Sequence, residues 1–204
     1  FCIHIGSVTS IINTSRDAPV HVAACISRMI DPALCVFDWL YSGHLQRFPN
    51  LKVLLSEGGV SWIPAALENA DYQVRRHGAH IKKAGDFDVS LQGGFSVPVA
   101  STQRTRASSV DWVEGAMPSD LFRRQIFGCY FRNEPGLAHL DEIGVDNVMI
   151  EVDFPHSDST WPHTIQMAEE SLGDKPEEVQ DKVLFGNAVR VFNLDLPAPP
   201  VMQQ

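Results

Sequence analysis

The stretch NVMIEVDFPHSDSTWP, residues 147–162, decides the fold class. Apolar side chains alternate with the others from residue 147 to residue 153, and this period of two predicts a strand over 147–153. One face of this strand is expected to be apolar, and the other face ends in the carboxylates of Glu151 and Asp153. The stretch therefore predicts a strand that delivers acids at its C-terminal end.

A loop with polar side chains follows this strand directly and carries His156 and Asp158. In α/β proteins, ligands and catalytic groups gather at the C-terminal ends of strands and in the loops that follow. Neighbouring carboxylates raise each other's pKa unless a cation or a proton compensates them. We therefore predict a functional site here. The alternative is that Glu151 and Asp153 lie on the exposed face of an edge strand and that Asp158 caps the next helix.

Composition and charge set the class of protein. With 204 residues, of which 44% are hydrophobic and 20% charged, the chain matches a single soluble globular domain. The formal net charge of -9 excludes a general nucleic-acid binder, which needs clustered Lys and Arg. There is no run of about eighteen apolar residues, so no membrane span is expected, and no signal peptide is visible. The four cysteines form no close pair, which favours a reducing, cytoplasmic location.

Strands and helices are expected to alternate along the chain. Strands are predicted over 1–6, 51–56, 125–131 and 147–153. Helices are predicted over 19–48, 62–83, from 118, 135–143, 164–172, 176–185 and 187–194. Asp31-Pro32 is a start signal for a second part of the first helix. Residues 84–118 lack periodicity, as expected for an irregular insertion or a cover loop, and 197–204 form a tail.

This alternation requires parallel strands joined by helical crossovers. Four strand–helix units are too few to close a barrel, which needs about eight. A free-standing flavodoxin-like domain is a further alternative, but no phosphate-binding loop follows any predicted strand. The chain is therefore α/β, and its units are expected to belong to a larger assembly.

Three motifs resemble the second half of the amidohydrolase-related family, which includes aminocarboxymuconate-semialdehyde decarboxylase, resorcylate-type decarboxylases and lactone hydrolases. They are FPNLKVLLSEGG at 48–59, DFPH at 153–156 and FGNAVRVF at 185–192. The resemblance runs from His4 onward and implies a (β/α)8 TIM barrel. Residues 1–196 are then expected to supply approximately strands five to eight and their helices. The first half of the barrel is expected upstream or on another chain.

The resemblance also implies a divalent metal, zinc or alternatively manganese, at the C-terminal mouth of the barrel. The family's site uses an early His-x-His, a histidine that ends the fifth strand and an aspartate that ends the eighth. His4 matches the fifth-strand histidine, and Asp153 matches the eighth-strand aspartate. The His-x-His pair has no counterpart in this sequence.

Glu57 marks a departure from the family pattern. Many members carry a histidine before Gly-Gly, where it moves protons beside the metal, and this sequence has Glu57. A carboxylate near a metal and a second acid can move protons, or it can bind the metal. His156 is expected to orient the substrate or to hold Asp153 in place. Asp153 is also expected to accept a proton from the water that the metal binds. Glu151 is expected to be the buried partner of an arginine.

These residues imply a metal-dependent hydrolase or non-oxidative decarboxylase. Its substrate is expected to be a small carboxylated molecule, cyclic or aromatic, and its partners are expected to be the missing N-terminal half-barrel and a second copy in a homo-oligomer. No nucleic-acid or membrane partner is expected. The alternative is a catalytically inactive barrel that serves as a binding or assembly module. A His-x-His pair upstream of Phe1 favours the enzyme, and its absence from the full-length gene favours the module.

Overall fold

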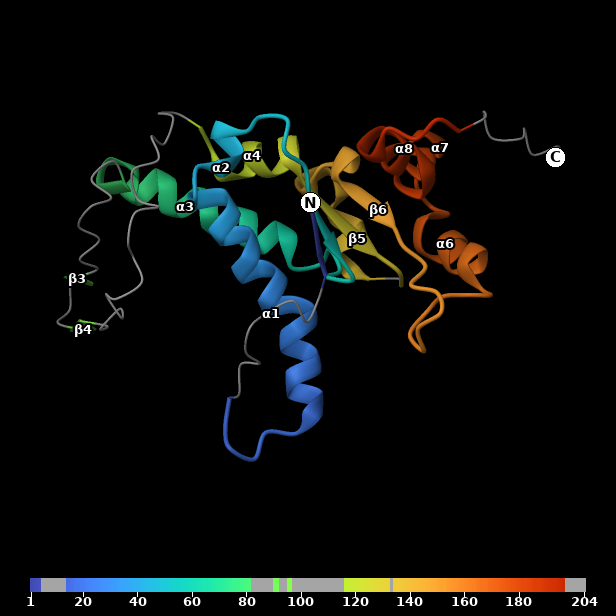
Figure 1. The fold of residues 1–204 in the computed structure, drawn as a ribbon, viewed down its shortest axis with the longest axis horizontal. Coiled ribbons are helices and arrows are strands. Elements are labelled where there is room, and N and C mark those ends of the chain that lie inside the picture. The colour runs from blue at the N-terminus through green and yellow to red at the C-terminus, as the bar shows by residue number, and fades with distance from the viewer. Residues whose placement is uncertain (5–13, 82–89, 92–94, 97–115, 133, 197–204) are drawn as a thin grey trace.

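A four-stranded parallel sheet forms the centre of the structure (Figure 1). Its strands are β1 (Cys2–His4), β2 (Val53–Ser56), β5 (Ile126–Tyr130) and β6 (Val148–Ile150). They lie in the order β1-β2-β5-β6, and each neighbouring pair is parallel. The structure is a computed structural model that describes residues 1–4, 14–81, 90–91, 95–96, 116–132 and 134–196. The predicted α/β fold with a parallel sheet is confirmed.

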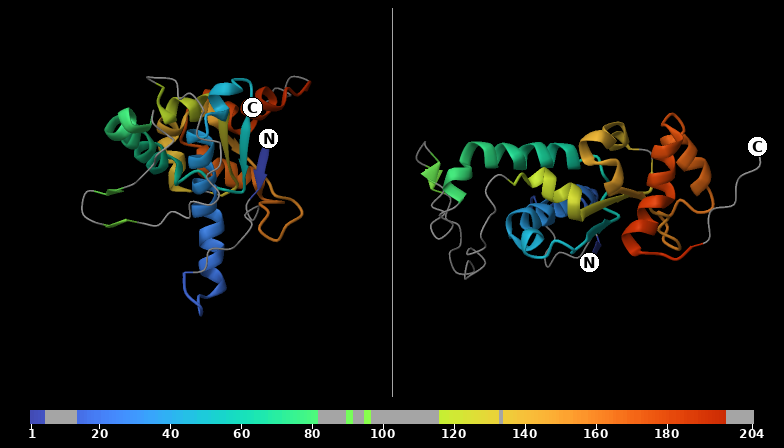
Figure 2. Two further views of the ribbon diagram at one scale, coloured as in Figure 1. Left: turned by 60° about the vertical axis from the view of Figure 1, so that its left-hand side comes forward. Right: turned by 90° about the horizontal axis from the view of Figure 1, so that it is seen from above.

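Helices connect the strands. The helices before β5 are α1 (Val20–Tyr41), α2 (His44–Arg47), α3 (Ile63–Ile81) and α4 (Pro118–Gln125). Between β5 and β6 lie the 3-10 helix η3 (Pro135–His139), α5 (Leu140–Ile143) and the 3-10 helix η4 (Val145–Asn147). After β6 come α6 (Thr164–Leu172), α7 (Glu177–Asp181), the π-helical η5 (Lys182–Gly186) and α8 (Asn187–Phe192). Figures 1 and 2 show α6 to α8 beyond β6, on the opposite side from α1 to α4.

Both faces of the sheet are buried, because successive side chains of a strand point to opposite sides. On one face, strand residues such as Leu55 and Tyr130 belong to a large apolar cluster with residues of α1, α3 and α4. On the other face, Leu54 and Phe127 belong to a smaller cluster that includes Val191 of α8. The sheet is therefore packed against helices on both faces.

The strand predicted over 147–153 differs from the observed one in two ways. Its second face is not polar, since Met149 is only 3% exposed and packs in the smaller cluster. The prediction of a single apolar face is wrong because the sheet is covered on both sides. The strand also ends at Ile150. The backbone N–H of Glu151 still donates to the carbonyl of Tyr130 in β5 at 2.8 Å, and Asp153 lies in the connection that follows.

Helix α1 continues through Pro32 without a break. The predicted second start at Asp31-Pro32 is therefore wrong. A proline inside a helix lacks the N–H that the ladder requires, and it is tolerated only where packing compensates. Pro32 is buried and packs closely on Gly58, where an added Cβ atom would lie 3.3 Å from the proline ring. Tertiary packing at the end of β2 thus overrides the local signal.

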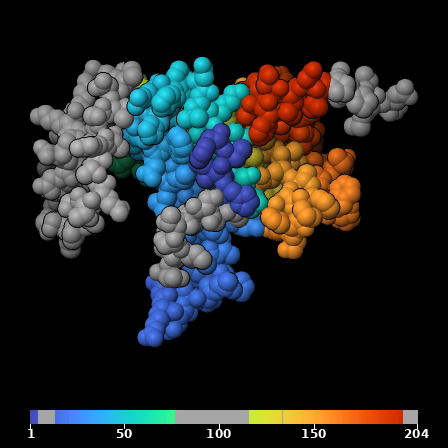
Figure 3. Space-filling model, in the orientation of Figure 1, coloured from blue at the N-terminus to red at the C-terminus, as the bar shows by residue number. Residues whose placement is uncertain are grey.

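Much of α1 is apolar and exposed. Val20 is 76% exposed, and the large side chains of Met29, Ile30 and Leu34 are also exposed. Figure 3 shows the first half of the helix projecting from the body of the molecule. By length and composition alone, α1 is able to cross a membrane, although the core helix of a soluble protein and a signal sequence near an N-terminus meet the same criterion. Only 22% of the most apolar 18-residue stretch of α1 is buried in this structure.

The irregular segment predicted over 84–118 lies mostly outside the described residues. Within it, Ser90–Leu91 (β3) and Phe95–Ser96 (β4) form a short antiparallel pair. Its last residue, Pro118, begins α4. The predicted tail over 197–204 also lies outside the described residues.

Candidate functional site

Glu57 and Asp153 lie at the same edge of the sheet, because parallel strands carry their C-terminal ends to one side. Glu57 follows the last residue of β2, and Asp153 follows β6 closely. Both residues have a left-handed backbone, with φ of 59° for Glu57 and 57° for Asp153. Among the described residues other than glycine, only Asn193 shares this conformation. Such a backbone costs on the order of 1–3 kcal/mol and is concentrated at functional sites.

Two histidines contact these carboxylates. His4 Nε2 at the end of β1 lies 2.8 Å from Glu57 Oε1, and His156 Nδ1 lies 2.8 Å from Asp153 Oδ1. His156 Nδ1 also lies 3.9 Å from Glu57 Oε1. Ligand atoms of Glu57, Asp153 and His156 all lie within 4.8 Å of one another, and we refer to these three residues as the carboxylate–histidine cluster.

The donor set of this cluster fits a divalent cation. Two carboxylates and an imidazole are ligands that zinc and manganese accept in proteins. The structure joins Asp153 to Glu57 and His156, and it places His4 against Glu57. The predicted ligand pair, His4 and Asp153, is thus connected through Glu57. That this pair holds the metal stays a prediction.

Glu151 is the third carboxylate at this edge. It accepts hydrogen bonds from the backbone N–H of Glu57, at 2.6 Å, and from Ser56 Oγ, at 3.2 Å. These groups take the place of the predicted arginine partner, which is wrong for the described residues. Burial is the main cause that raises the pKa of Glu151 to about 7, while its hydrogen bonds lower it and the charges of Glu57 and Asp153 raise it.

Replacing Glu151 with glutamine is expected to flatten the pH dependence of stability in the metal-free protein. The folded state holds the Glu151 proton more tightly than the unfolded chain, so this stabilisation is complete below about pH 4.5 and is lost as the pH rises through about 7. The loss is on the order of 2 kcal/mol. Denaturant unfolding in a chelator from pH 5 to pH 8 measures it. Glu170→Gln, at an exposed position on α6, is the matched control. A Glu151→Gln protein with the parent's pH profile would contradict the assignment.

The loop after Asp153 is held by its own backbone. The N–H of His156 donates to the carbonyl of Asp153 at 2.9 Å, and the N–H of Thr160 donates to the carbonyl of Val152 at 3.1 Å. Asp158 does not cap α6, as the alternative required, because it pairs with Arg28 of α1. The loop therefore fixes His156 beside Asp153 and turns Asp158 toward another element.

Arg28 and Phe131 are contributors at this edge that the sequence did not reveal. Phe131 directly follows β5, and the Cζ atom of Arg28 lies 5.1 Å from the centre of its ring. Arg28 is the only Lys or Arg in α1, and this single cation in an apolar helix is the signal that was available. Nothing in the residues around Phe131 distinguishes it from a core aromatic.

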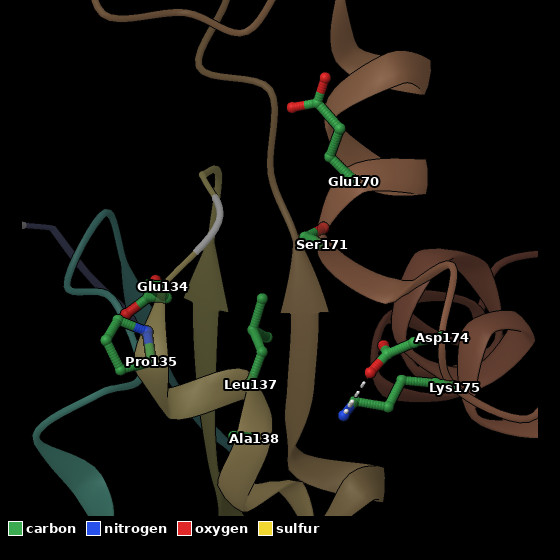
Figure 4. A pocket seen from close by; sticks show the side chains of 8 residues that line it. All are labelled: Glu134, Pro135, Leu137, Ala138, Glu170, Ser171, Asp174 and Lys175. Carbon is green, nitrogen blue, oxygen red and sulfur yellow. Dashed lines mark hydrogen bonds and ion pairs between the residues drawn. The ribbon is translucent and has the colours of Figure 1, made fainter.

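A surface pocket of about 480 Å³ lies apart from the carboxylate–histidine cluster, between η3 and α6 (Figure 4). Its lining residues are Glu134, Pro135, Leu137, Ala138, Glu170, Ser171, Asp174 and Lys175. Glu134 is committed to structure, because its carboxylate accepts the backbone N–H groups of Val60 and Ser61 at 2.9 and 3.0 Å. The lining of this pocket shares no residue with the carboxylate–histidine cluster.

Comparison with known families decides the assignment. The sequence profile described as Amidohydrolase matches residues 13–194. The chain belongs to the amidohydrolase family. This confirms the resemblance inferred from the motifs, and the family fold is a TIM barrel. No curated protein matches the amidohydrolase chain significantly.

Solved structures with the same fold include enzymes that act on aromatic acids. A dihydroxybenzoic acid decarboxylase from Polaromonas sp. JS666, with bound manganese and the inhibitor 2-nitroresorcinol, is 19% identical with a TM-score of 0.51, over 81% of this chain and 40% of that chain. The 5-carboxyvanillate decarboxylase from Sphingomonas paucimobilis is 20% identical with a TM-score of 0.52, over 90% of this chain and 44% of that chain. An amidohydrolase from Mycobacterium avium subsp. paratuberculosis K-10 is 14% identical with a TM-score of 0.55, over 79% of this chain and 32% of that chain. Similarity at this level shows the fold alone, and the amidohydrolase chain spans less than half of each of these proteins.

Proposed function

We propose that residues 1–196 supply the second half of a (β/α)8 barrel in a metal-dependent enzyme, with β1, β2, β5 and β6 as strands five to eight. Residues 84–118 form an insertion or cover loop in this proposal. The substrate is a small carboxylated cyclic or aromatic molecule, which the enzyme hydrolyses or decarboxylates without oxidation. The observation that carries the proposal is the convergence of Glu57, Asp153 and His156 within 4.8 Å at the C-terminal strand ends.

The metal site is assigned to His4 and Asp153, with Glu57 between them as the acid–base group. A divalent ion there supplies positive charge that polarises a substrate carbonyl or carboxylate. Zinc is the first candidate and manganese the second, and the Polaromonas decarboxylase contains manganese. Three carboxylates at one edge favour binding of a cation, because a positive ion offsets their mutual repulsion.

Glu57 moves the proton in either reaction. In decarboxylation, the carbon–carbon bond to the carboxylate breaks, carbon dioxide leaves, and the remaining carbon takes a proton from an acid. In hydrolysis, a base takes a proton from the attacking water. Glu57 is only 9% exposed, and its Oε1 atom lies 2.8 Å from His4 Nε2, so its carboxylate is held at the proposed site. His156 orients Asp153 through the 2.8 Å contact between their side chains.

The test uses the full-length protein with zinc or manganese restored after chelation. Turnover of 2,6-dihydroxybenzoate or 5-carboxyvanillate is followed by carbon dioxide release, and a panel of aromatic lactones tests hydrolysis. Metal-dependent turnover of any of these supports the enzyme. A protein that binds the metal and turns over no carboxylated substrate is a binding or assembly module.

The four free cysteines support a proposed cytoplasmic location.

Residues 1–204 expressed alone are expected to associate. Phe1 beside the edge strand β1 is 70% exposed, and α1 leaves a row of large apolar side chains uncovered. Unpaired strand edges and apolar patches of this kind drive association with a missing half or with a copy. Light scattering after size exclusion is expected to show masses above one chain. The double variant Met29→Glu and Leu34→Glu is expected to reduce them. A stable monomer that binds one metal tightly and turns over substrate would show that these residues are a complete domain.

A further inference from the structure

Arg28 belongs to α1, and its side chain contacts residues at the C-terminal edge of the sheet. Its side chain pairs with Asp158, which lies in the loop that also holds His156. Its guanidinium lies over Phe131, and Phe131 directly follows the last residue of β5. Both partners are therefore at the C-terminal side of the sheet. Figure 1 shows that the first half of α1 and the loop after β6 extend on the side to which the strands point.

The two contacts of Arg28 differ in what they fix. Phe131 is only 6% exposed, so its ring is a firm support that orients the guanidinium plane. The side chain of Asp158 is 54% exposed, and that of Arg28 is 28% exposed. An ion pair this close to solvent contributes little net free energy, because water screens it. The ring thus holds Arg28 in place, whereas its carboxylate partner is easily exchanged.

An anionic substrate needs a cation at this edge. Glu57, Glu151 and Asp153 face the same region, and they disfavour a second anion unless a positive group receives it. Arginine presents parallel N–H donors that match a carboxylate. Arg28 already donates from one of these nitrogens, Nη2, to a carboxylate oxygen of Asp158.

We propose that Arg28 binds the carboxylate of the substrate and that Asp158 occupies this place as a counter-ion until the substrate displaces it. This inference rests on the proposed function, because it assigns the substrate-recognition group of the same site. Phe131 orients the guanidinium, and release of Asp158 frees the loop that carries His156. Arg28 is thereby the residue that selects carboxylated over neutral ring compounds.

Calorimetric binding of benzoate and of its neutral analogue benzamide tests the proposal in the full-length protein. Arg28→Ala is expected to weaken benzoate binding by roughly 10-fold or more and to change benzamide binding less than about 2-fold. Arg28→Lys keeps the charge and loses the paired donors, so an intermediate loss is expected. Asp158→Asn removes the competing carboxylate and is expected to strengthen benzoate binding. Arg47→Ala is the matched control, since Arg47 also lies over a ring, that of Phe48, at 5.2 Å.

If Arg28 recognises the substrate, Arg28→Ala and Asp158→Asn change benzoate binding in opposite directions. If the ion pair only holds the loop, Asp158→Asn weakens benzoate binding as Arg28→Ala does, and the proposal is overturned. The Cζ atom of Arg132 lies 5.8 Å from the centre of the same Phe131 ring, so Arg132 is the rival cation. Equal losses for benzoate and benzamide, or a loss in Arg132→Ala in place of Arg28→Ala, also overturn the proposal. Measurements with and without metal keep the two proposals distinct. Selectivity for benzoate that depends on Arg28 supports this inference even where metal-dependent turnover is not found.

Discussion

Replacing Glu57 with glutamine lowers turnover by roughly 10²–10⁴ if Glu57 transfers the proton. The change keeps the size of the side chain and removes its titrating group. Glu57 Oε1 lies 2.8 Å from His4 Nε2, and the backbone N–H of Glu57 is held by Glu151. Because the backbone contact does not depend on the side chain, the variant is expected to fold. The loss should therefore appear in kcat.

Steady-state kinetics with restored metal, together with metal analysis of the same samples, measure this effect. Glu134→Gln is the matched control, because Glu134 is also a carboxylate beyond a strand end and accepts backbone N–H groups outside the cluster. The control is expected to lose stability and to keep the kcat of its folded fraction. Turnover of Glu57→Gln within a few-fold of the parent would exclude proton transfer by Glu57.

Replacing Asp153 with asparagine is expected to remove the metal. Asp153 contributes a carboxylate oxygen to the cluster and holds His156, so the amide loses both a charged ligand and the partner of the imidazole. Loss of an outer partner of a ligand already costs about 10–100-fold in metal affinity, and loss of the ligand itself is expected to cost more. Turnover falls in proportion to the metal content.

Competition with a chelating dye measures the metal affinity of Asp153→Asn and His4→Ala. His4→Ala is expected to weaken the affinity as well, although His4 contacts Glu57 and lies at the edge strand. Asp146→Asn, whose parent side chain pairs with Lys182 on the surface, is the control. Unchanged metal affinity in both site variants would place the metal elsewhere.

The sequence was sufficient for the features that depend on local pattern. Alternating or continuous runs of apolar residues located the four strands of the central sheet, and the alternation with helices required them to be parallel. The position of Glu57 after a buried strand followed from the apolar run before it. These features are set by residues that are neighbours along the chain.

Features that depend on distant contacts were not accessible in this way. The continuity of α1 depends on the packing of Pro32 against Gly58. The burial of Met149 depends on α8, which covers the second face of the sheet. The contact of Arg28 with Asp158 joins residues that are 130 positions apart. Each is fixed by the tertiary structure, and local sequence patterns do not predict these contacts.

The order of the strands in the sheet, β1-β2-β5-β6, is also their order in the chain. Each strand therefore brings its own residue to the shared edge, as β1 brings His4 and β2 brings Glu57. A change in one connecting loop can then alter one contribution and leave the others in register. Under the two proposals made above, a substitution at Arg28 is therefore expected to change the selection of the substrate while His4 and Asp153 keep their places at the shared edge.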